Sequence, residues 1–305
     1  MKDNFWFISN GYFGSLCLEN LLKNNWIPKI IVTKQNSFVD YKSKDSGINK
    51  YYVKDKIYKD EELIGNLYNF NPKLIIVVDF GQIIKDPFLK YFCIGIHPSL
   101  LPLYRGPNPI ISNLLDTKNN VGGVTVYKLS SGIDNGNIIG QKEIYELDNQ
   151  TYNSVAGYAS EYGVNIITKM PPLNEILFKL QDNNKATYTS KINLEDRYVS
   201  FKNNTAKEIL RKVNAFSGYK EAYCIFKNKK IKLYNVRRLY QKLEDKKAGY
   251  IEDFKYMGLK NIKPGILCKD KEILILEKLQ PEGKKVLSSL DWINGFRHTK
   301  EDLFE

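Results

Sequence analysis

Among the side chains of this sequence that could transfer protons, His97 and Asp134 stand out because each lies in a segment rich in proline or glycine. His97 is one of two histidines and lies in the segment Ile94–Pro109, which contains four prolines. Each proline lacks an N–H and fixes φ, so this segment is neither a helix nor a central strand. The apolar run 74–78 before it predicts a buried strand. A rigid loop after a buried strand is where an α/β sheet usually places its site.

Asp134 lies between Gly132 and Gly136, so its carboxylate is expected on a tight turn. An imidazole titrates near neutral pH and can act as a general base, and a carboxylate can orient it and stabilise its charged form. His97 and Asp134 can also be explained without a role in catalysis. A single histidine in a loop is more often structural, and an Asp in such a turn often bonds its own backbone.

The elements that must position these loops alternate between strands and helices. The patterns predict strands at 5–9, 29–33, 74–78 and 124–129, and helices at 14–24, 61–70, 107–115, 154–170 and 174–181. Residues 34–60 are polar and read as irregular. Strand, helix, strand in this order predicts parallel pairing with a right-handed crossover.

After residue 185 the pattern changes to one helix and several short strands. We expect a helix at 205–213, strands at 221–226, 230–234, 266–268 and 273–276, and a frayed tail at 302–305. Several short strands fit a small barrel. We therefore predict an α/β domain over 1–185, a connecting segment over 186–204 and a β-barrel domain over 205–305.

Composition restricts the class of protein. The 305 residues are 43% hydrophobic, and no apolar stretch approaches the roughly 20 residues that span a bilayer. Four cysteines without a C-x-x-C pair, together with two histidines, cannot form a zinc site, so no metal is expected. Scattered cysteines fit a reducing compartment. We expect a cytoplasmic protein without membrane contact; no pattern predicts an oligomeric state.

The net charge of +12 is concentrated in the second half. Residues 191–305 hold 26 Lys and Arg against 16 Asp and Glu, and residues 202–238 hold eleven against two. A Lys-rich genome would raise the lysine content of both halves, whereas a basic domain is typical of a polyanionic partner. We predict a contiguous positive face that includes Lys207, Arg211, Lys212, Lys227, Lys229, Arg237 and Arg238.

The order of these motifs resembles the folate-dependent formyltransferase family. The family segment H-x-S-L-L-P-x-x-R-G and a later Asp are matched by His97, Ser99, Leu100, Leu101, Pro102, Arg105, Gly106 and Asp134. Residues 279–285 and 291–297 are similar to the end of the C-terminal domain of members that formylate methionyl-tRNA. The resemblance implies a Rossmann-like catalytic domain and an OB-like C-terminal barrel.

The resemblance also implies a reaction, in which an amine attacks the formyl carbon of 10-formyltetrahydrofolate. His97 would move the protons, and Asp134 would hold the imidazole. The resemblance implies a folate site at the loop Phe80, Gly81, Gln82 and Ile83. Ser99 and Leu100 are also expected to bind the folate. The residues expected to contact the acceptor are Arg105, Lys207, Arg211 and Lys212.

Three alternatives remain for the function. Initiator methionyl-tRNA as the acceptor is favoured by the C-terminal match and the basic charge, because phosphate contacts supply much of such binding. A nucleotide-linked amino sugar is favoured by Gly95 and by the lack of a Gly-Arg-Gly loop in 34–60. A non-catalytic RNA- or folate-binding homologue would fit the Gly95 departure, but His97 and Asp134 are retained.

Gly95 stands where the family usually carries Asn, two residues before the His. Glycine offers no side-chain donor to the oxyanion of the tetrahedral intermediate. Asn108, Gln82 and protonated His97 are the candidate replacements, and we favour Asn108 because an amide restores the lost donor type. The alternative for Asn108 is a cap on the helix that begins near Pro109.

Overall fold

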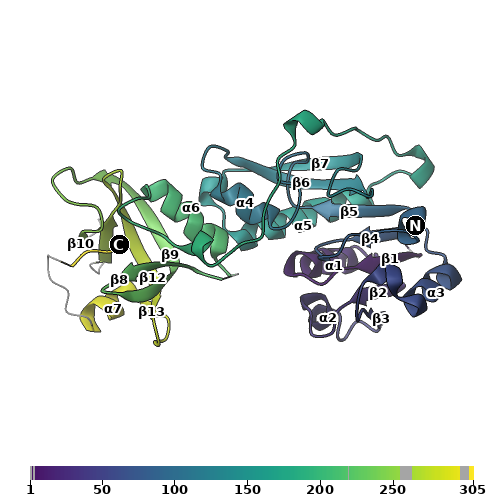
Figure 1. Ribbon diagram of the computed structural model, residues 1–305, viewed down its shortest axis with the longest axis horizontal. Helices are drawn as coiled ribbons and strands as arrows, with labels where there is room; N and C mark the ends of the chain where they lie inside the picture. The colour runs from purple at the N-terminus through teal and green to yellow at the C-terminus, as the bar shows by residue number, and fades with distance from the viewer. Residues whose placement is uncertain (1, 3, 219, 255–262, 296–301) are drawn as a thin grey trace. The chain divides into compact units, whose positions relative to one another are not determined.

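The computed structural model describes residues 2, 4–218, 220–254, 263–295 and 302–305, and the chain forms two compact units (Figure 1). The first unit comprises 1–113, 121–145 and 154–191, and the second comprises 114–120, 146–153 and 192–305. Two short segments of the first half therefore belong to the second unit. The segment 186–204, expected to connect the domains, is divided between the units at residue 191.

The first unit is built on a seven-stranded sheet in the order β3-β2-β1-β4-β5-β6-β7. Its strands are β1 (Phe5–Ile8), β2 (Ile30–Thr33), β3 (Asn49–Tyr52), β4 (Leu74–Val77), β5 (Cys93–His97), β6 (Val121–Lys128) and β7 (Ile138–Tyr145). The strands from β3 to β5 are parallel, whereas β6 and β7 join antiparallel. The predicted Rossmann-like α/β class is confirmed.

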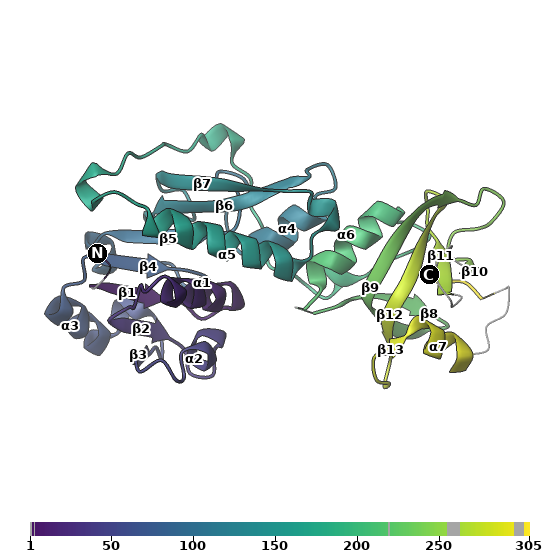
Figure 2. The same cartoon turned by 180° about the vertical axis from the view of Figure 1, so that it is seen from behind.

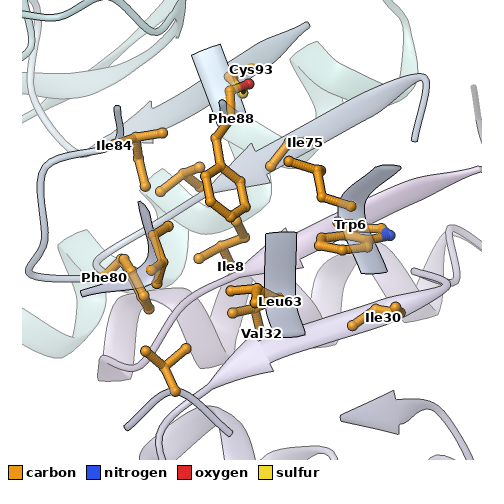
Figure 3. Close-up of a cluster of buried hydrophobic side chains, with 14 residues drawn as sticks. Trp6, Ile8, Ile30, Val32, Leu63, Ile75, Phe80, Ile84, Phe88 and Cys93 are labelled. Carbon is orange, nitrogen blue, oxygen red and sulfur yellow. Dashed lines mark hydrogen bonds between the residues drawn. The ribbon is translucent and has the colours of Figure 1, made fainter. Parts of the chain in front are cut away.

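The helices of this unit pack on the sheet or on a neighbouring helix, and the longer ones bury an apolar stripe. They are α1 (Tyr12–Lys23), α2 (Phe38–Lys42), α3 (Glu61–Phe70), α4 (Pro109–Leu115) and α5 (Tyr152–Thr168). Leu63 and Leu67 of α3 meet Trp6 and Ile75 of the sheet in one buried cluster (Figure 3). Helices α1 and α5 lie side by side (Figure 2), where Asn20 Nδ2 donates to Ser160 Oγ over 3.0 Å.

Several stretches of the first unit differ from the prediction. The segment 94–109 was expected to be neither a helix nor a central strand, yet residues 94–97 belong to the fully buried internal strand β5, because the first proline, Pro98, comes only after His97. Strand β7 was not predicted either. Residues 34–60 contain α2 and the edge strand β3, which is half exposed and so lacks the apolar pattern of a buried strand. The helix expected at 174–181 is absent. A 3-10 turn at Leu173–Glu175 is followed by extended chain that bridges Ile138 through Lys179, so backbone pairing replaces the helix.

The second unit holds an antiparallel sheet in the order β10-β11-β12-β9-β8, with β13 paired to β12. Its elements are α6 (Ala206–Phe216), β8 (Ala222–Phe226), β9 (Lys229–Lys242), β10 (Ile251–Phe254), β11 (Lys263–Leu267), β12 (Glu272–Pro281), β13 (Leu287–Ser288) and α7 (Ser289–Gly295). The predicted short strands are present, and β9 is much longer than expected. A closed barrel is not confirmed.

The C-terminal residues are ordered, and the prediction of a frayed tail is wrong. Phe304 is fully buried and packs against the rings of Phe201, Phe226 and Trp292. Leu303 bridges Tyr250, and Phe304 bridges Phe226. Burial of one phenyl ring is worth about 1.5–3 kcal/mol, which holds this segment in place. The motif positions 296 and 297 lie outside the described residues.

Candidate active site

His97 is the last residue of β5, and Asp134 follows β6 on a turn. Nδ1 of His97 lies 3.6 Å from Oδ2 of Asp134, and the two side chains are only 9% and 18% exposed. The predicted proximity of these two groups is confirmed.

The other ring nitrogen of His97 fixes how the proton is distributed. Nε2 lies 2.9 Å from the backbone oxygen of Tyr104, and since a carbonyl only accepts, Nε2 carries the hydrogen. In the neutral ring Nδ1 then holds the lone pair, and Nδ1 is the nitrogen that faces Asp134. A proton taken up on Nδ1 would therefore lie beside a carboxylate that balances its charge.

Asp134 is held by donors to both of its oxygens. Gly106 N–H donates to Oδ2 over 2.7 Å, and the Tyr127 hydroxyl donates to Oδ1 over 2.6 Å. Asp134 has a φ of 48°, a left-handed conformation that Asp adopts more readily than most residues. Tyr127 lies in β6 and was not expected in the site. Burial, and next the charge of Asp134, raise the pKa of Tyr127 well above its usual value, so the phenol remains a donor.

The prediction for Arg105, contact with the acceptor, is not what the structure shows. Its side chain is almost fully buried and bonds its own chain. Nε and Nη2 donate to Gln181 Oε1 over 3.1 and 2.8 Å, Nη2 to Asn183 Oδ1 over 2.9 Å, and Nη1 to the Tyr188 hydroxyl over 3.2 Å. Arg105 thus anchors the extended segment after residue 176 to the loop that follows His97.

Gln181 joins the two loops of the site. While its oxygen accepts from Arg105, its Nε2 donates to the backbone oxygens of Asp134 and Gly136 over 2.8 and 2.7 Å. One amide therefore fixes the Asp134 turn against the loop that follows His97. Gln181 was not predicted from the sequence, because it falls in a stretch whose pattern predicts a helix. The prolines of the loop that follows His97 gave no indication that Arg105 of this loop bonds Gln181.

The residues expected to bind folate divide into exposed and internal groups. Gly81 and Ile83 are exposed, whereas Phe80 packs inside the buried cluster of Figure 3. The Gln82 side chain bonds the backbone of residues 55–57. Its Nε2 donates to Asp55 O and its Oε1 accepts from Ile57 N, each over 3.1 Å. Here the Gln82 amide is engaged by backbone rather than directed at an oxyanion. The contacts of Phe80 and Gln82 hold the loop 80–83 in place. Contact of these residues with folate remains a prediction.

Ser99 and Leu100 belong to the loop interior. Ser99 is fully buried, and its hydroxyl donates to Leu103 O over 2.6 Å. Thr125 Oγ1 donates to Ser99 O over 2.7 Å and accepts from Leu101 N over 3.0 Å. The hydroxyl of Ser99 therefore braces the loop instead of facing a ligand, which corrects the expectation for this residue. Leu100 is half buried.

Asn108 has a φ of 58°, and its amide donates to Ser190 O over 3.3 Å. Its backbone oxygen accepts from Ser112 N and so begins the first turn of α4. The amide is thus directed at the segment 176–190. A role of Asn108 toward the oxyanion stays a prediction.

The basic residues expected to bind the acceptor lie in different environments in the second unit. Arg211 is fully buried and donates to Leu114 O, Asn119 O and Asp148 Oδ1 over 2.6, 3.0 and 2.7 Å. This burial excludes it from an acceptor surface, and that expectation is corrected. Lys207 pairs with Asp148 at 3.2 Å. Lys212 donates to Tyr198 O, and burial lowers its pKa.

Within the described residues, no group of three or more His, Cys, Asp and Glu side chains is arranged to hold a metal ion. In that same part of the chain, no helix has both the length and the apolar character needed to cross a membrane.

Two family descriptions match this sequence. Residues 7–170 match the family described as formyl transferase, and residues 191–297 match the formyl transferase C-terminal domain. The first match covers more than half of the chain. The chain therefore belongs to the formyl transferase family. It is an enzyme of formyl transfer, and its formyl donor is a formylated tetrahydrofolate.

Curated relatives resemble this chain over most of its length. A methionyl-tRNA formyltransferase of Caldicellulosiruptor saccharolyticus is 31% identical over 255 residues, covering 82% of this chain and 79% of that protein. The protein of the same name from Borrelia turicatae is 32% identical over 253 residues, covering 80% and 79%.

Solved structures share the fold at lower identity. A sugar 3N-formyl transferase, determined in the presence of dTDP and 5-N-formyl-THF, has a TM-score of 0.62 at 22% identity and covers 93% of this chain and 100% of its own. A methionyl-tRNA formyltransferase from Clostridium thermocellum has a TM-score of 0.56 at 16% identity, covering 87% and 98%. At these identities the likeness supports the fold alone.

Proposed function

We propose that this enzyme transfers the formyl group of 10-formyltetrahydrofolate to the amino group of initiator methionyl-tRNA. The observation that carries the chemistry is the His97–Asp134 pair, with Nδ1 and Oδ2 3.6 Å apart. The acceptor is supported by the two relatives named methionyl-tRNA formyltransferase, which share over 30% identity across most of both chains.

The proposed mechanism is an acyl transfer with proton movement. The acceptor amine attacks the formyl carbon, a tetrahedral intermediate forms, and its C–N bond to the folate N10 then breaks. The attacking nitrogen must lose a proton, and N10 must gain one. His97 is the base that takes the first proton, and Asp134 stabilises the resulting imidazolium. Returning that proton to N10 completes the cycle without another reagent.

The surface of the second unit supports a polyanionic acceptor only in part. Of the cations expected on one face, Lys227, Arg237 and Arg238 pair with Asp302, Glu277 and Glu272 at 2.7, 3.0 and 2.5 Å, which offsets their charge. Lys230 and Lys232 differ from them. In the described part of the chain neither has a carboxylate at ion-pair distance, and both lie on one face of β9.

An aromatic side chain adjoins these lysines. Lys232 is the cross-strand partner of Tyr223, and the Nζ of Lys230 lies 4.4 Å from the centroid of the Tyr223 ring. Lysines interleaved with an aromatic ring are typical of surfaces that bind nucleic acid. We assign Lys230 and Lys232 to the tRNA contact.

We expect the double substitution Lys230→Glu/Lys232→Glu to raise KM for methionyl-tRNA and to leave KM for 10-formyltetrahydrofolate unchanged. Each lost phosphate contact should reduce the dependence of log(kcat/KM) on log[salt] by about 1. Lys29→Glu/Lys73→Glu changes the net charge equally on exposed lysines of the first unit and is the matched control. Equal effects of the two pairs would contradict the assignment.

The acceptor itself is tested by incubating the enzyme and 10-formyltetrahydrofolate with charged initiator tRNA and, separately, with nucleotide-linked amino sugars. Formyl-methionyl-tRNA as the main product is the expected result. Formylation of an amino sugar alone would overturn the proposed acceptor and keep the chemistry. Failure with both acceptors, in a protein that still binds the folate, would overturn the proposed acceptor and mean that the formyl group goes to a different amine.

A further inference from the structure

Gly95 and Tyr127 are cross-strand partners in the pair formed by β5 and β6. A Cβ atom built on Gly95 would lie 2.5 Å from Cε1, 2.8 Å from Cζ and 2.9 Å from the hydroxyl oxygen of Tyr127. Contacts this short exclude any side chain at position 95 while the Tyr127 ring keeps its place. The space beside β5 that a larger residue would use is therefore filled by the phenol of Tyr127.

The hydroxyl of Tyr127 is directed at the catalytic pair. It donates to Asp134 Oδ1 over 2.6 Å, while Asp134 Oδ2 accepts from Gly106 N–H and faces Nδ1 of His97. Because the two oxygens of one carboxylate are rigidly linked, a bond to Oδ1 also sets the direction of Oδ2. Tyr127 is only 7% exposed, so it acts through Asp134 rather than through a substrate.

We propose that Tyr127 is a positioning residue for formyl transfer, which occupies the space left open by Gly95 and holds Asp134 with Oδ2 toward His97. This inference rests on the proposed role of the His97–Asp134 pair. In this arrangement position 95 supplies no side-chain donor to the oxyanion. The space beside Gly95 is occupied by the Tyr127 ring.

The test is the substitution Tyr127→Phe, which keeps the ring in place and removes the hydroxyl. With 10-formyltetrahydrofolate and methionyl-tRNA we expect kcat to fall by about 10- to 100-fold, the range equivalent to one hydrogen bond to a charged group. KM for the folate should not change, because the hydroxyl is turned to Asp134. An unchanged kcat would overturn the proposal.

Tyr51→Phe is the matched control. The Tyr51 hydroxyl also donates to a carboxylate oxygen over 2.6 Å, Oδ1 of Asp60, at a place away from His97. Both variants lose the same type of bond, and only Tyr127→Phe is expected to lower kcat. Similar losses of kcat in the two variants would mean that the effect is general destabilisation and would overturn the assignment.

A double substitution separates this inference from the proposed function. If Tyr127 acts only through Asp134, Tyr127→Phe/Asp134→Asn should be no slower than Asp134→Asn within about twofold, because coupled residues are non-additive. Losses that multiply would overturn the proposal. A normal rate in Asp134→Asn would instead contradict the proposed function. A slow Asp134→Asn beside a normal Tyr127→Phe would contradict this inference alone.

Discussion

His97→Ala is expected to lower kcat for formyl transfer by at least about 10²-fold, the usual contribution of a general base. The substitution removes the nitrogen that faces Asp134 at 3.6 Å. Tyr127, the phenol bonded to the same carboxylate, cannot replace this base because its raised pKa keeps it protonated. Single-turnover measurements with 10-formyltetrahydrofolate and methionyl-tRNA would give the rate of the chemical step.

His97→Gln is the control for the structural contribution of His97. A glutamine amide can still donate to the backbone oxygen of Tyr104, which accepts from Nε2 in the wild-type protein. We expect His97→Gln to keep the melting temperature and to lose kcat as fully as His97→Ala. Near-normal turnover in His97→Gln would mean that the ring serves only as a hydrogen-bond donor, and the assignment of a base would fail.

Gly95→Asn should destabilise the first unit and lower turnover. The family pattern suggests that an Asn there would supply an oxyanion donor. The structure predicts the opposite, because its Cβ would lie 2.5 Å from the Tyr127 ring. Overpacking of this kind costs about 3 kcal/mol, and it would displace the Tyr127 hydroxyl from Asp134. Chemical denaturation and steady-state kinetics measure the two effects.

Two further variants make the Gly95 prediction specific. A Cβ atom placed on Gly65 in α3 would meet no heavy atom within 4 Å, so Gly65→Asn should change stability by less than about 0.5 kcal/mol. Gly95→Asn/Tyr127→Val removes the clashing ring and should recover part of the lost stability. A Gly95→Asn protein as stable as the wild type, with faster formyl transfer, would show that Tyr127 can move aside at no cost.

The sequence was sufficient for most elements that bury an apolar face. The fully buried strand β5 was missed, because the prolines of segment 94–109 favoured a loop over its whole length. Apolar runs predicted strands β1, β2 and β4, and apolar residues at helical spacing predicted helices α1 and α3. Elements that bury little were missed. The edge strand β3 is half exposed, and the segment 176–190 is held by hydrogen bonds to the site loops rather than by packing.

The site was predicted where it depends on a single loop and missed where it depends on strand register. His97 and Asp134 were identified from their local surroundings. Tyr127 could not be, because its relation to Gly95 exists only in the antiparallel register of β5 and β6. The burial of Arg105 and Arg211 was missed because their partners are distant in sequence. A charged residue is expected at the surface unless such partners are known.

The buried hydrogen bonds of Arg211 limit where this chain can be truncated or exchanged with the chain of a relative. The three partners of Arg211, Leu114, Asn119 and Asp148, come from the two short segments of the first half that belong to the second unit. A gene fragment for 192–305 would encode the guanidinium without its counter-charge or its two carbonyl acceptors, and an uncompensated buried charge is strongly destabilising. The C-terminal sequence is therefore not a portable module. An exchange with a relative would have to transfer matching 114–120 and 146–153 segments as well.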